Sequence, residues 1–264
     1  MIVYRTAEEI ALIRKSSQIA ALILAELRQL IRPGIMTKEL DEYAEARVRS
    51  LGAKPAFKGY RGYPASLCTS VNEEIVHGIP SSRRLKEGDI ISLDFGVYYE
   101  GYYGDAAVTY PVGQVSPLAQ KLIETAQGAL YRGLEMVRVG RRISDISHAI
   151  QTYVESQGFS VIRAFVGHGI GQALHEEPQV PNFGPPGRGA VIKPGLTLAI
   201  EPMISAGHWQ EEILDDGWTA VTRDRSLAAH FEHTVVATEN GVEILSLPAE
   251  TEAIKILGTE ARRA

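Results

Sequence analysis

The stretch IRPGIMTKELDEYAEARVRSLGA, residues 31–53, lies over VRVGRRISDISHAIQTYVESQGF, residues 137–159, at an offset of 106. Further along, KEGDIISLD (86–94) lies over KPGLTLAIE (193–201) at an offset of 107. Matches in the same order at a nearly constant offset favour a duplicated unit over chance. We therefore expect a single domain, residues 1–264, built from two related halves at about 1–112 and 113–264.

Each half predicts the same order of elements. A long amphipathic helix comes first. In the first half its helical spacing is given by Ile10, Ile13, Ser17, Ala20, Leu24 and Leu27. A second helix is expected to begin with Thr37 or Ser144 as its N-cap. Gly52 and Gly158 are expected to end these second helices.

Strand-rich segments follow the helices in both halves. Helices that are segregated from strands point to an α+β fold with antiparallel pairing. We expect the halves to pack about a pseudo-two-fold axis as a sandwich. A cleft would then lie between their antiparallel sheets, with the helices outside.

The composition excludes several classes of protein. The chain has 264 residues, a net charge of −5 and one cysteine, Cys68, so an intramolecular disulfide is impossible. The longest apolar run, residues 19–25, is too short for a membrane span, and no basic stripe suggests nucleic acid. The first residues do not resemble a signal peptide, and the helix pattern begins by Thr6, so no N-terminal extension is expected. We expect a cytoplasmic globular protein, with a monomer as the default state.

Two aspartates lie in GDIISLDFGVYYEGYYGDAAVTYPVG, residues 88–113, which predicts a β-hairpin. A turn at Glu100-Gly101 makes Asp105 a diagonal neighbour of Asp94 on one sheet face, at about 7–8 Å. Two like charges on one buried face are unfavourable unless a cation lies between them. On this segment alone, Asp105 could instead mark a turn, with only Asp94 buried.

Two glutamates lie in other apolar strands. Glu201, in GLTLAIEPMI, holds the position equivalent to Asp94 in the repeat. Glu232, in AAHFEHTVVATENGVEI, lies in a strand that enters a hairpin turn at Asn240-Gly241. An acidic residue that recurs at the equivalent position of an apolar strand indicates a functional site more than a chance surface charge.

The histidines divide into two groups. FVGHGIGQALHEEPQVP, residues 165–181, puts His168 and His175 seven residues apart, which by itself fits a polar turn as well as a binding site. Its glycines lack the spacing of a nucleotide-binding loop. His148, on a helix, and His208, in a loop, have no carboxylate partner nearby in sequence and are expected to be surface or structural. Strand alternation turns His233 away from the acidic side of its strand, so we expect a structural role for it too.

Four carboxylates and a histidine make a hard, oxygen-rich donor set. Such a set suits two divalent cations, such as Mn²⁺, Fe²⁺ or Co²⁺ bridged by carboxylates, better than structural zinc. Two metal ions about 3.5–4 Å apart can hold a bridging hydroxide and clamp a peptide carbonyl.

The motifs also stand in a recognisable order. They are NEEIVHGIP with His77, LDFG with Asp94, GDAAVTY with Asp105, GHGIGQALHEEP with His168 and His175, IEPM with Glu201, and FEHT with Glu232. Over essentially its whole length the chain resembles type I methionine aminopeptidase. The resemblance implies the pita-bread fold, which agrees with the repeat, and a single catalytic domain. It also implies removal of the initiator methionine from nascent polypeptides at the ribosome, with a preference for a small second residue.

The resemblance further implies a role for each site residue. The metal ligands would be Asp94, Asp105, His168, Glu201 and Glu232, with Asp105 and Glu232 bridging the two ions. Glu201 would also accept the proton of the attacking water and return it to the leaving amine. His175 would donate a hydrogen bond to the scissile carbonyl, and His77 would contact the peptide near the leaving nitrogen.

The methionine pocket is expected, by the same resemblance, to have six walls: Tyr60, Tyr63, Cys68, His77, Leu174 and Trp218. Leu174 departs from many relatives, which carry an aromatic residue there. Cys68 is expected to be a wall and not a nucleophile, because nothing nearby in sequence lowers its pKa. The tract RSLAAHFEHT departs from the commoner RSAQFEHT at residues 228–230.

Two alternatives remain. An Xaa-Pro aminopeptidase of the same fold would carry a sizeable extra N-terminal domain, for which this chain has no room. A metal-free relative that binds peptides would have lost metal ligands, whereas all five candidate ligands are present here.

Overall fold

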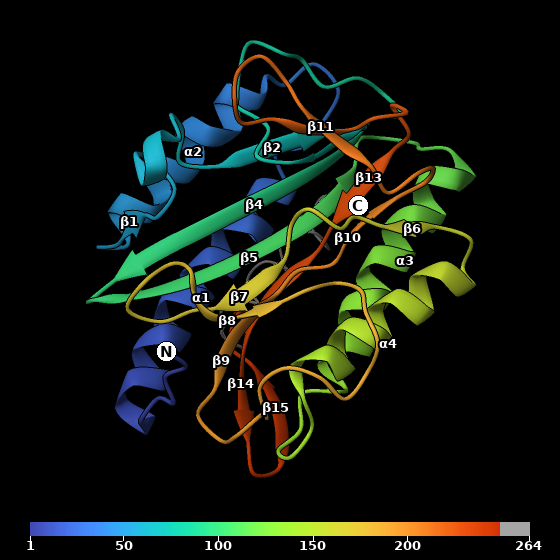
Figure 1. The fold of residues 1–264 in the computed structure, drawn as a ribbon. Helices are drawn as coiled ribbons and strands as arrows, with labels where there is room; N and C mark the ends of the chain where they lie inside the picture. Colours follow the sequence, from blue (N-terminus) through green and yellow to red (C-terminus); the bar gives the residue numbers. More distant parts are fainter. Residues whose placement is uncertain (249–264) are drawn as a thin grey trace.

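The computed structural model describes residues 1–248 (Figure 1), and the last part of the second predicted half, 249–264, lies outside the described residues. The α-helices of the described part are α1 (Ala7–Arg28), α2 (Thr37–Ser50), α3 (Pro117–Leu134) and α4 (Ile143–Ser156), and η1 (Tyr60–Gly62) is a short 3₁₀ turn. The strands are β1 (Lys54–Pro55), β2 (Cys68–Val71), β3 (Glu74–Val76), β4 (Ile90–Tyr99), β5 (Tyr102–Pro111), β6 (Ser160–Val161), β7 (Gly167–Gly169), β8 (Glu176–Val180), β9 (Thr197–Ile200), β10 (Met203–Ser205), β11 (Glu211–Ile213), β12 (Ala220–Thr222), β13 (Ala228–His230), β14 (Glu232–Thr238) and β15 (Gly241–Ile244).

The first helix forms where the sequence predicts it. Thr6 and Glu9 cap α1 reciprocally, because the Glu9 N–H donates to the Thr6 hydroxyl at 3.3 Å and the Thr6 N–H donates to the Glu9 carboxylate at 2.9 Å. The predicted apolar face is buried at Ile13, Ala20 and Leu24, among others. No helix in the described residues is both long and apolar enough to cross a membrane.

The predicted N-caps of the second helices are wrong by one and two residues. Met36 and Arg142 are the caps, and Thr37 and Ser144 lie inside the first turn. In each case an acidic residue three positions after the cap accepts a hydrogen bond from the cap's backbone N–H, at 2.8 and 2.9 Å. The first two N–H groups of each helix donate instead to backbone carbonyls of a neighbouring segment, residues 81–83 for α2 and 188–190 for α4. No hydroxyl is therefore needed at the cap position.

The two halves correspond element by element. In chain order α1 corresponds to α3, α2 to α4, β4 to β9 and β5 to β14. Gly52 and Gly158, at φ +76° and +86°, lie just past the caps of α2 and α4, as predicted. The repeat in the sequence is therefore a repeat in the fold.

One nine-stranded sheet joins the halves, with the order β1-β4-β5-β14-β9-β7-β8, β2 beside β4 and β15 beside β14. All strand pairs are antiparallel, which confirms the α+β prediction. The expected cleft between two separate sheets is corrected, because β5 pairs directly with β14 and makes the two sheets one. This pairing also satisfies the backbone hydrogen-bonding groups along two strand edges, which separate sheets would leave unpaired. Two three-stranded sheets, β13-β10-β6 and β11-β12-β3, complete the strands of the described part.

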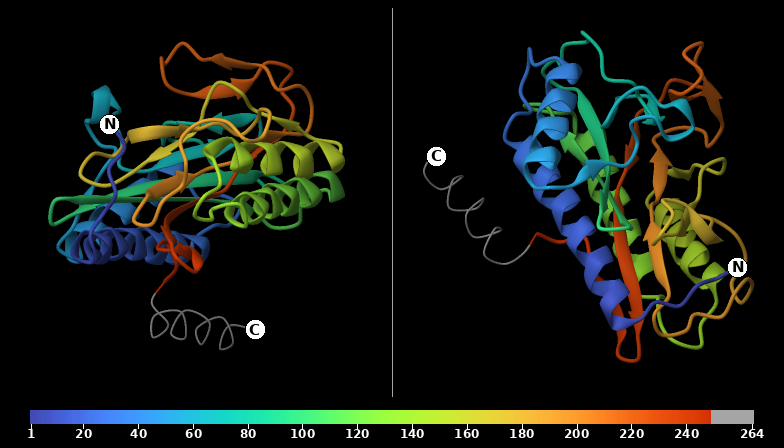
Figure 2. Two further views of the ribbon diagram at one scale, coloured as in Figure 1. Left: turned by 60° about the horizontal axis from the view of Figure 1, so that its bottom comes forward. Right: turned by 90° about the vertical axis from the view of Figure 1, so that its left-hand side faces the viewer.

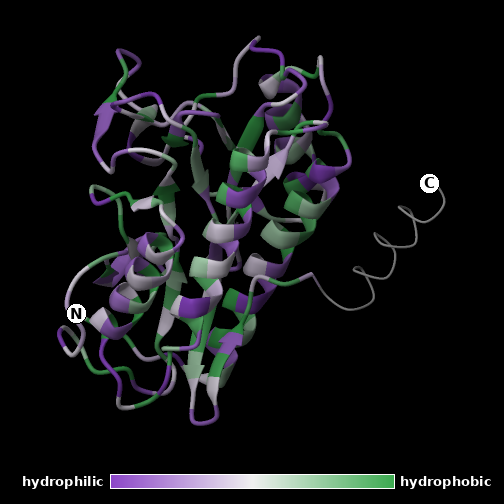
Figure 3. Cartoon of the chain, turned by 90° about the vertical axis from the view of Figure 1, so that its right-hand side faces the viewer, coloured by the Kyte–Doolittle hydropathy of each residue, from purple (hydrophilic) through white to green (hydrophobic). Residues whose placement is uncertain are grey.

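Strand alternation gives the central sheet one apolar face. Leu93 and Phe95 of β4 pack with α1 and α2, and Leu198 and Val235 of β9 and β14 pack with α3 and α4. In Figure 2, α1 lies on one side of the strands and the β11–β12 hairpin on the other. In Figure 3 the helices carry both hydrophilic and hydrophobic residues, and the strands beside them are largely hydrophobic. The residues between these apolar positions point to the opposite face.

The β4–β5 hairpin has the predicted register. Tyr99 is opposite Tyr102, and Glu100 and Gly101 form the turn with φ of 46° and 92°. Positive φ at both central residues is the type I′ geometry, which matches the twist of the flanking strands. The turn thus sets which residues of β4 and β5 face each other.

The β14–β15 turn is displaced by one residue from the prediction. Thr238 pairs with Gly241, so the central residues are Glu239 and Asn240 and not Asn240-Gly241. The Thr238 hydroxyl donates to the Gly241 carbonyl at 2.9 Å and accepts from the Asn240 N–H at 3.2 Å. This hydroxyl closes the turn one residue earlier than the Asn-Gly pattern suggests.

Gly104 permits the close packing of α1 on the sheet. A Cβ at this position would lie 2.3 Å from the backbone nitrogen of Ser17 and 2.5 Å from its Oγ. We predict that Gly104→Ala lowers the free energy of unfolding by about 3 kcal/mol, because α1 must move away from β5. Urea unfolding followed by circular dichroism measures this, and adding Ser17→Ala is not expected to restore stability.

The matched control is Gly101→Ala at the tip of the same hairpin. A Cβ there meets no atom within 4 Å, but φ is +92°, so only backbone strain of about 1–2 kcal/mol is expected. Equal losses in the two variants would contradict the proposed contact between α1 and β5.

Candidate metal centre

The central strands bring three acidic residues to one face of the sheet. Asp94 of β4 is opposite Ala107 of β5, and Ala107 is in turn opposite Glu232 of β14. Asp105 lies two residues from Ala107 and therefore on the same face. The predicted diagonal relation of Asp94 and Asp105 follows from this register.

The second half adds an imidazole and a fourth carboxylate. His168 of β7 is opposite Ala199 of β9, and Glu201 follows directly after β9, two residues beyond Ala199. Gly167 and Gly169 let β7 approach its neighbours, because a Cβ at either would lie within 2.5 Å of a backbone oxygen of β9 or β8. Larger residues there would push His168 away from the sheet.

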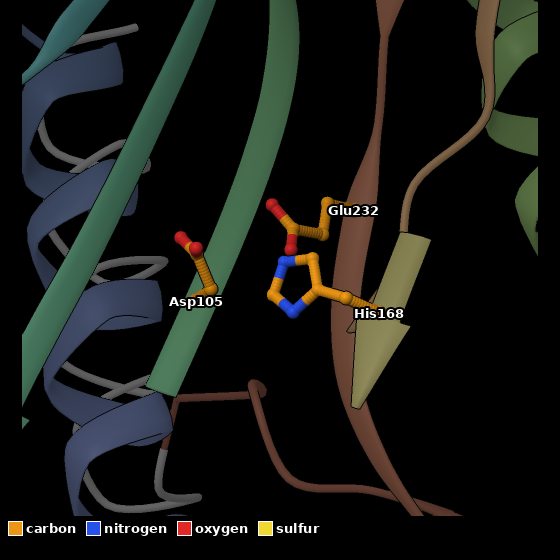
Figure 4. Close-up of side chains that lie close together, drawn as sticks. All are labelled: Asp105, His168 and Glu232. Atoms are coloured by element: carbon orange, nitrogen blue, oxygen red, sulfur yellow. The ribbon is translucent and has the colours of Figure 1, made fainter. Parts of the chain in front are cut away.

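Three ligand atoms converge at the centre of this face (Figure 4). Asp105, His168 and Glu232 each offer one atom, and these atoms lie within 4.8 Å of one another. The fourth carboxylate, Glu201, lies with Oε1 3.4 Å from Nε2 of His168. Nδ1 of His168 is 2.8 Å from the Gly169 carbonyl, so Nδ1–H donates there and the lone pair of Nε2 faces the carboxylates.

Burial and mutual repulsion keep this cluster from carrying its full negative charge. Burial, followed by the neighbouring carboxylates, raises the pKa of Asp94, Glu201 and Glu232 well above the ordinary values. Burial raises the pKa of Asp105 to about 7 and lowers the pKa of His168 to about 4. The imidazole is therefore neutral at neutral pH, the form that binds metal ions.

The donor set fits a divalent cation. Oδ1 of Asp94 and Oε1 of Glu232 are buried without a hydrogen-bond partner in the described residues. A cation would satisfy these oxygens and remove the repulsion, and carboxylates with one imidazole are ligands of the Mn²⁺, Fe²⁺ and Co²⁺ type. The described part of the chain could thus hold such an ion at this point.

A cavity of about 160 Å³ opens beside the cluster. It is lined by Phe57, Tyr60, Arg61, Tyr63, Cys68, His77, Asp94, Asp105, His168, Leu174, His175, Glu201, Trp218 and Glu232. Every residue that the sequence analysis selects for the site lies on this wall. The structure adds two residues to the set.

The added residues are Phe57 and Arg61, which sequence reasoning missed. The ring of Phe57 occupies the space over Gly96, where a Cβ would lie 2.5 Å from Cε1. A glycine inside a strand signals such a close approach, so Gly96 was the available clue. Arg61, with φ +49°, places its guanidinium 5.4 Å from the centre of the Tyr60 ring, and its tertiary position had no sequence signal.

One end of the cavity is apolar. Phe57, Tyr63, Cys68 and Leu174 pack in one buried cluster, and Trp218 meets the Tyr63 ring edge-on at 5.2 Å. Burial raises the pKa of the Cys68 thiol well above its ordinary value, so the thiol is uncharged at neutral pH. The cavity therefore joins a charged end to an apolar end.

Two further histidines, His77 and His175, line the cavity. Nδ1 of His175 is 2.8 Å from the Tyr60 hydroxyl, and its ring centre is 4.2 Å from that of His168. Burial, followed by neighbouring positive groups, lowers the pKa of His175 to about 3. His77 has φ +61° and packs edge-on against Phe165 at 5.4 Å, and burial lowers its pKa. A left-handed conformation at a non-glycine residue is uncommon and often marks a functional site.

The remaining predicted histidines lie away from the cavity. His148 and His208 are exposed. Nδ1 of His233 is 2.8 Å from Oγ of Ser246, and His233 does not line the cavity. All three have the surface or structural positions that the sequence predicts.

Residues 11–239 match the family model Peptidase_M24, described as metallopeptidase family M24. The chain belongs to this family. Methionine aminopeptidase 1 of Bacillus subtilis is 54% identical over 246 residues, which cover 93% of this chain and 99% of that protein. A methionine aminopeptidase of Clostridium perfringens is 51% identical over 94% of this chain and 99% of its own length. The crystal structure of methionine aminopeptidase from Thermotoga maritima is 49% identical and superposes with a TM-score of 0.92, covering 94% of this chain and all of that one.

A more distant solved structure is similar to this M24 metallopeptidase in fold. The prolidase of Pyrococcus furiosus is 23% identical with a TM-score of 0.77, and the match covers 94% of this chain but 66% of that chain. Together with the nearer relatives, this confirms the pita-bread fold that the resemblance implies.

A buried ion pair anchors the loop that carries Leu174 and His175. The guanidinium of Arg5, 2% exposed, pairs with Oε2 of Glu176, and Oε1 of Glu176 accepts from the Ala173 N–H at 3.0 Å. A Cβ at position 171 would overlap the Arg5 guanidinium. The N-terminal segment of this metallopeptidase therefore holds one wall of the cavity in place.

We predict that Arg5→Met lowers the free energy of unfolding by about 3–5 kcal/mol, because it leaves the Glu176 carboxylate without its partner. Peptidase activity is expected to fall as well, because the loop that carries His175 is no longer held by the ion pair. Arg14→Met, which breaks the exposed pair of Arg14 and Glu243, is the control and should change stability by less than about 1 kcal/mol. Thermal and urea unfolding measure both, and similar losses would contradict the anchoring role.

Proposed function

We propose that the protein removes the N-terminal methionine from peptides and nascent chains, with a preference for a small second residue. The observation that carries this proposal is that an acidic end with imidazoles adjoins an apolar end within one cavity. The acidic end suits cations and a peptide terminus, and the apolar end suits an unbranched side chain. Relatives about half identical over nearly their full length are named methionine aminopeptidases, which supports the same substrate.

Two divalent cations, Mn²⁺, Fe²⁺ or Co²⁺, are proposed at the acidic end. Asp94, Asp105, His168, Glu201 and Glu232 would hold them. Bound there, such ions polarise a carbonyl and lower the pKa of water. The unpartnered oxygens of Asp94 and Glu232 support this assignment.

The side chains of the protein would supply the proton transfers and the orientation. Glu201, beside His168, would accept a proton from the attacking water and return it to the leaving amine. When the Tyr60 hydroxyl donates a hydrogen bond to Nδ1 of His175, the proton of the neutral imidazole lies on Nε2. The Nε2–H group would then donate a hydrogen bond to the oxyanion that develops on the scissile carbonyl. His77 would contact the peptide near the leaving nitrogen. Tyr60, Tyr63, Cys68, His77, Leu174 and Trp218 would line the methionine pocket.

The cellular setting is part of the proposal. Nascent N-termini at the ribosome would be the substrate, met in the cytoplasm by a monomer organised as one catalytic domain of two halves. The absence of a basic stripe in the sequence gives no reason to expect direct contact with nucleic acid.

Two short peptides test the substrate. With added Mn²⁺ or Co²⁺, we predict release of methionine from Met-Ala-Ser and no cleavage of Ala-Pro-Ser, because the apolar end of the cavity would hold the methionine side chain. Addition of a chelator should abolish release. Chromatography of the products measures both peptides.

The alternatives give different results in the same assay. Cleavage of Ala-Pro-Ser alone would favour an Xaa-Pro aminopeptidase. Binding of peptides without metal-dependent cleavage would favour a metal-free binding relative. Either result would overturn the proposed function.

Metal binding should displace protons near neutral pH. The raised pKa values of Asp94, Glu201 and Glu232, and that of about 7 for Asp105, mean that the metal-free cluster holds protons. Ligands must be deprotonated, so we predict that Mn²⁺ binding releases protons and tightens as the pH rises through about 7. Isothermal titration calorimetry in two buffers of different ionisation enthalpy measures the proton count.

Two variants control the calorimetry. Glu232→Gln removes one proposed ligand and should weaken binding and release fewer protons. Glu243→Gln, on the exposed side of the neighbouring β15, should bind like the natural chain. Proton release that is the same in both variants would contradict the assignment of Glu232.

A further inference from the structure

His230 is a buried histidine to which the sequence analysis assigns no role. It ends β13, is 1% exposed, and has neither ring nitrogen hydrogen-bonded in the described residues. Its backbone is fixed, because the His230 N–H donates to Oγ1 of Thr109 at 2.9 Å and Oγ1 of Thr109 donates to the His230 carbonyl at 2.8 Å. A neutral imidazole always carries one N–H donor, and a buried donor without a partner is rare in proteins. The ring therefore needs an acceptor.

A candidate acceptor is the carboxylate of Glu201. Nε2 of His230 lies 3.7 Å from Oε2 of Glu201, whereas Oε1 of the same carboxylate lies 3.4 Å from Nε2 of His168. Glu201 thus sits between two imidazoles, one on the cavity wall and one behind it. His230 itself does not line the cavity, so any effect on substrate must pass through a neighbouring residue such as Glu201.

The backbone of Glu201 is held independently of its side chain. Nδ2 of Asn182, another buried residue, donates to the Glu201 carbonyl at 3.0 Å. The carboxylate itself can still rotate about its side-chain bonds. Orientation of its two oxygens therefore depends on what each oxygen meets.

We propose that His230 is a positioning residue that donates its Nε2–H to Oε2 of Glu201 and thereby turns Oε1 towards His168 and the cavity. This inference rests on the proposed function, in which Glu201 moves a proton. The present separation exceeds a hydrogen bond by roughly 0.5–0.8 Å, and a small rotation of either side chain closes it. Hydrogen bonds of this kind are often long in a free enzyme and shorten in the complex with substrate.

Two substitutions separate positioning from packing. His230→Gln keeps an N–H donor, whereas His230→Leu keeps the apolar volume and removes the donor. We expect His230→Leu to lower kcat by about 10–100-fold and His230→Gln to recover most of it. KM is expected to stay within about twofold, because an interaction that aids only proton transfer acts on kcat. Melting temperatures check that both variants fold.

His233→Leu is the matched control. His233 lies three residues further along the chain, bonds to Ser246 and does not line the cavity, so its loss should leave kcat unchanged. Equal activity of His230→Leu and the natural chain, or equal losses in the Leu and Gln variants of His230, would overturn the proposal.

A spectroscopic measurement tests the pairing without any turnover. In metal-free protein labelled with ¹⁵N-histidine, we expect the His230 proton on Nε2, in a resonance that His230→Gln removes and that Glu201→Leu shifts. A proton on Nδ1, or a resonance insensitive to Glu201→Leu, would overturn the pairing. If methionine release fails but this signature is present, the proposed function falls and the pairing of His230 with Glu201 stands. If methionine release succeeds and the signature is absent, only the positioning role falls.

Discussion

The repulsion among four carboxylates, two buried and two half-buried, is the constraint on which the rest of this structure depends. Asp94, Asp105, Glu201 and Glu232 share one sheet face, where burial raises the pKa of each. Such a cluster persists only if protons or cations neutralise it and if the scaffold cannot relax away from it. The scaffold meets the second condition through the apolar side of the same strands. Leu93 and its neighbours pack against the helices and hold the strands in place.

Duplication explains how one face collects so many ligands. The equivalent strands β4 and β9 flank the central pair β5–β14 and bring Asp94 and Glu201 to opposite sides of it. The first half supplies two aspartates, and the second supplies His168 and two glutamates. Neither half has the full donor set. The pairing of β5 with β14 therefore connects the two halves and also forms the part of the sheet on which the site lies.

Local chemistry made part of this structure predictable, and the errors have local causes too. The positive-φ turn at Glu100-Gly101 sets the β4–β5 register, so the diagonal placement of Asp94 and Asp105 could be read from sequence. The helix caps were misplaced because backbone carbonyls of residues 81–83 and 188–190 accept the first N–H groups of α2 and α4, so that no cap hydroxyl is needed. The second hairpin was misplaced because the Thr238 hydroxyl closes its turn. In both cases a hydrogen bond formed in the folded chain outweighed the usual residue preference.

The sequence by itself determined the repeated order of helices and strands, the apolar and acidic faces of each central strand, and most of the residues that line the cavity. These depend on periodicity, turn geometry and ordered motifs, which act over a few residues. Only the tertiary structure decided that the two sheets are one, that Phe57 and Arg61 reach the cavity, and that His230 lies behind Glu201. Those contacts join segments far apart in the chain. Their distances follow from strand pairing and close packing between elements, which no local pattern encodes.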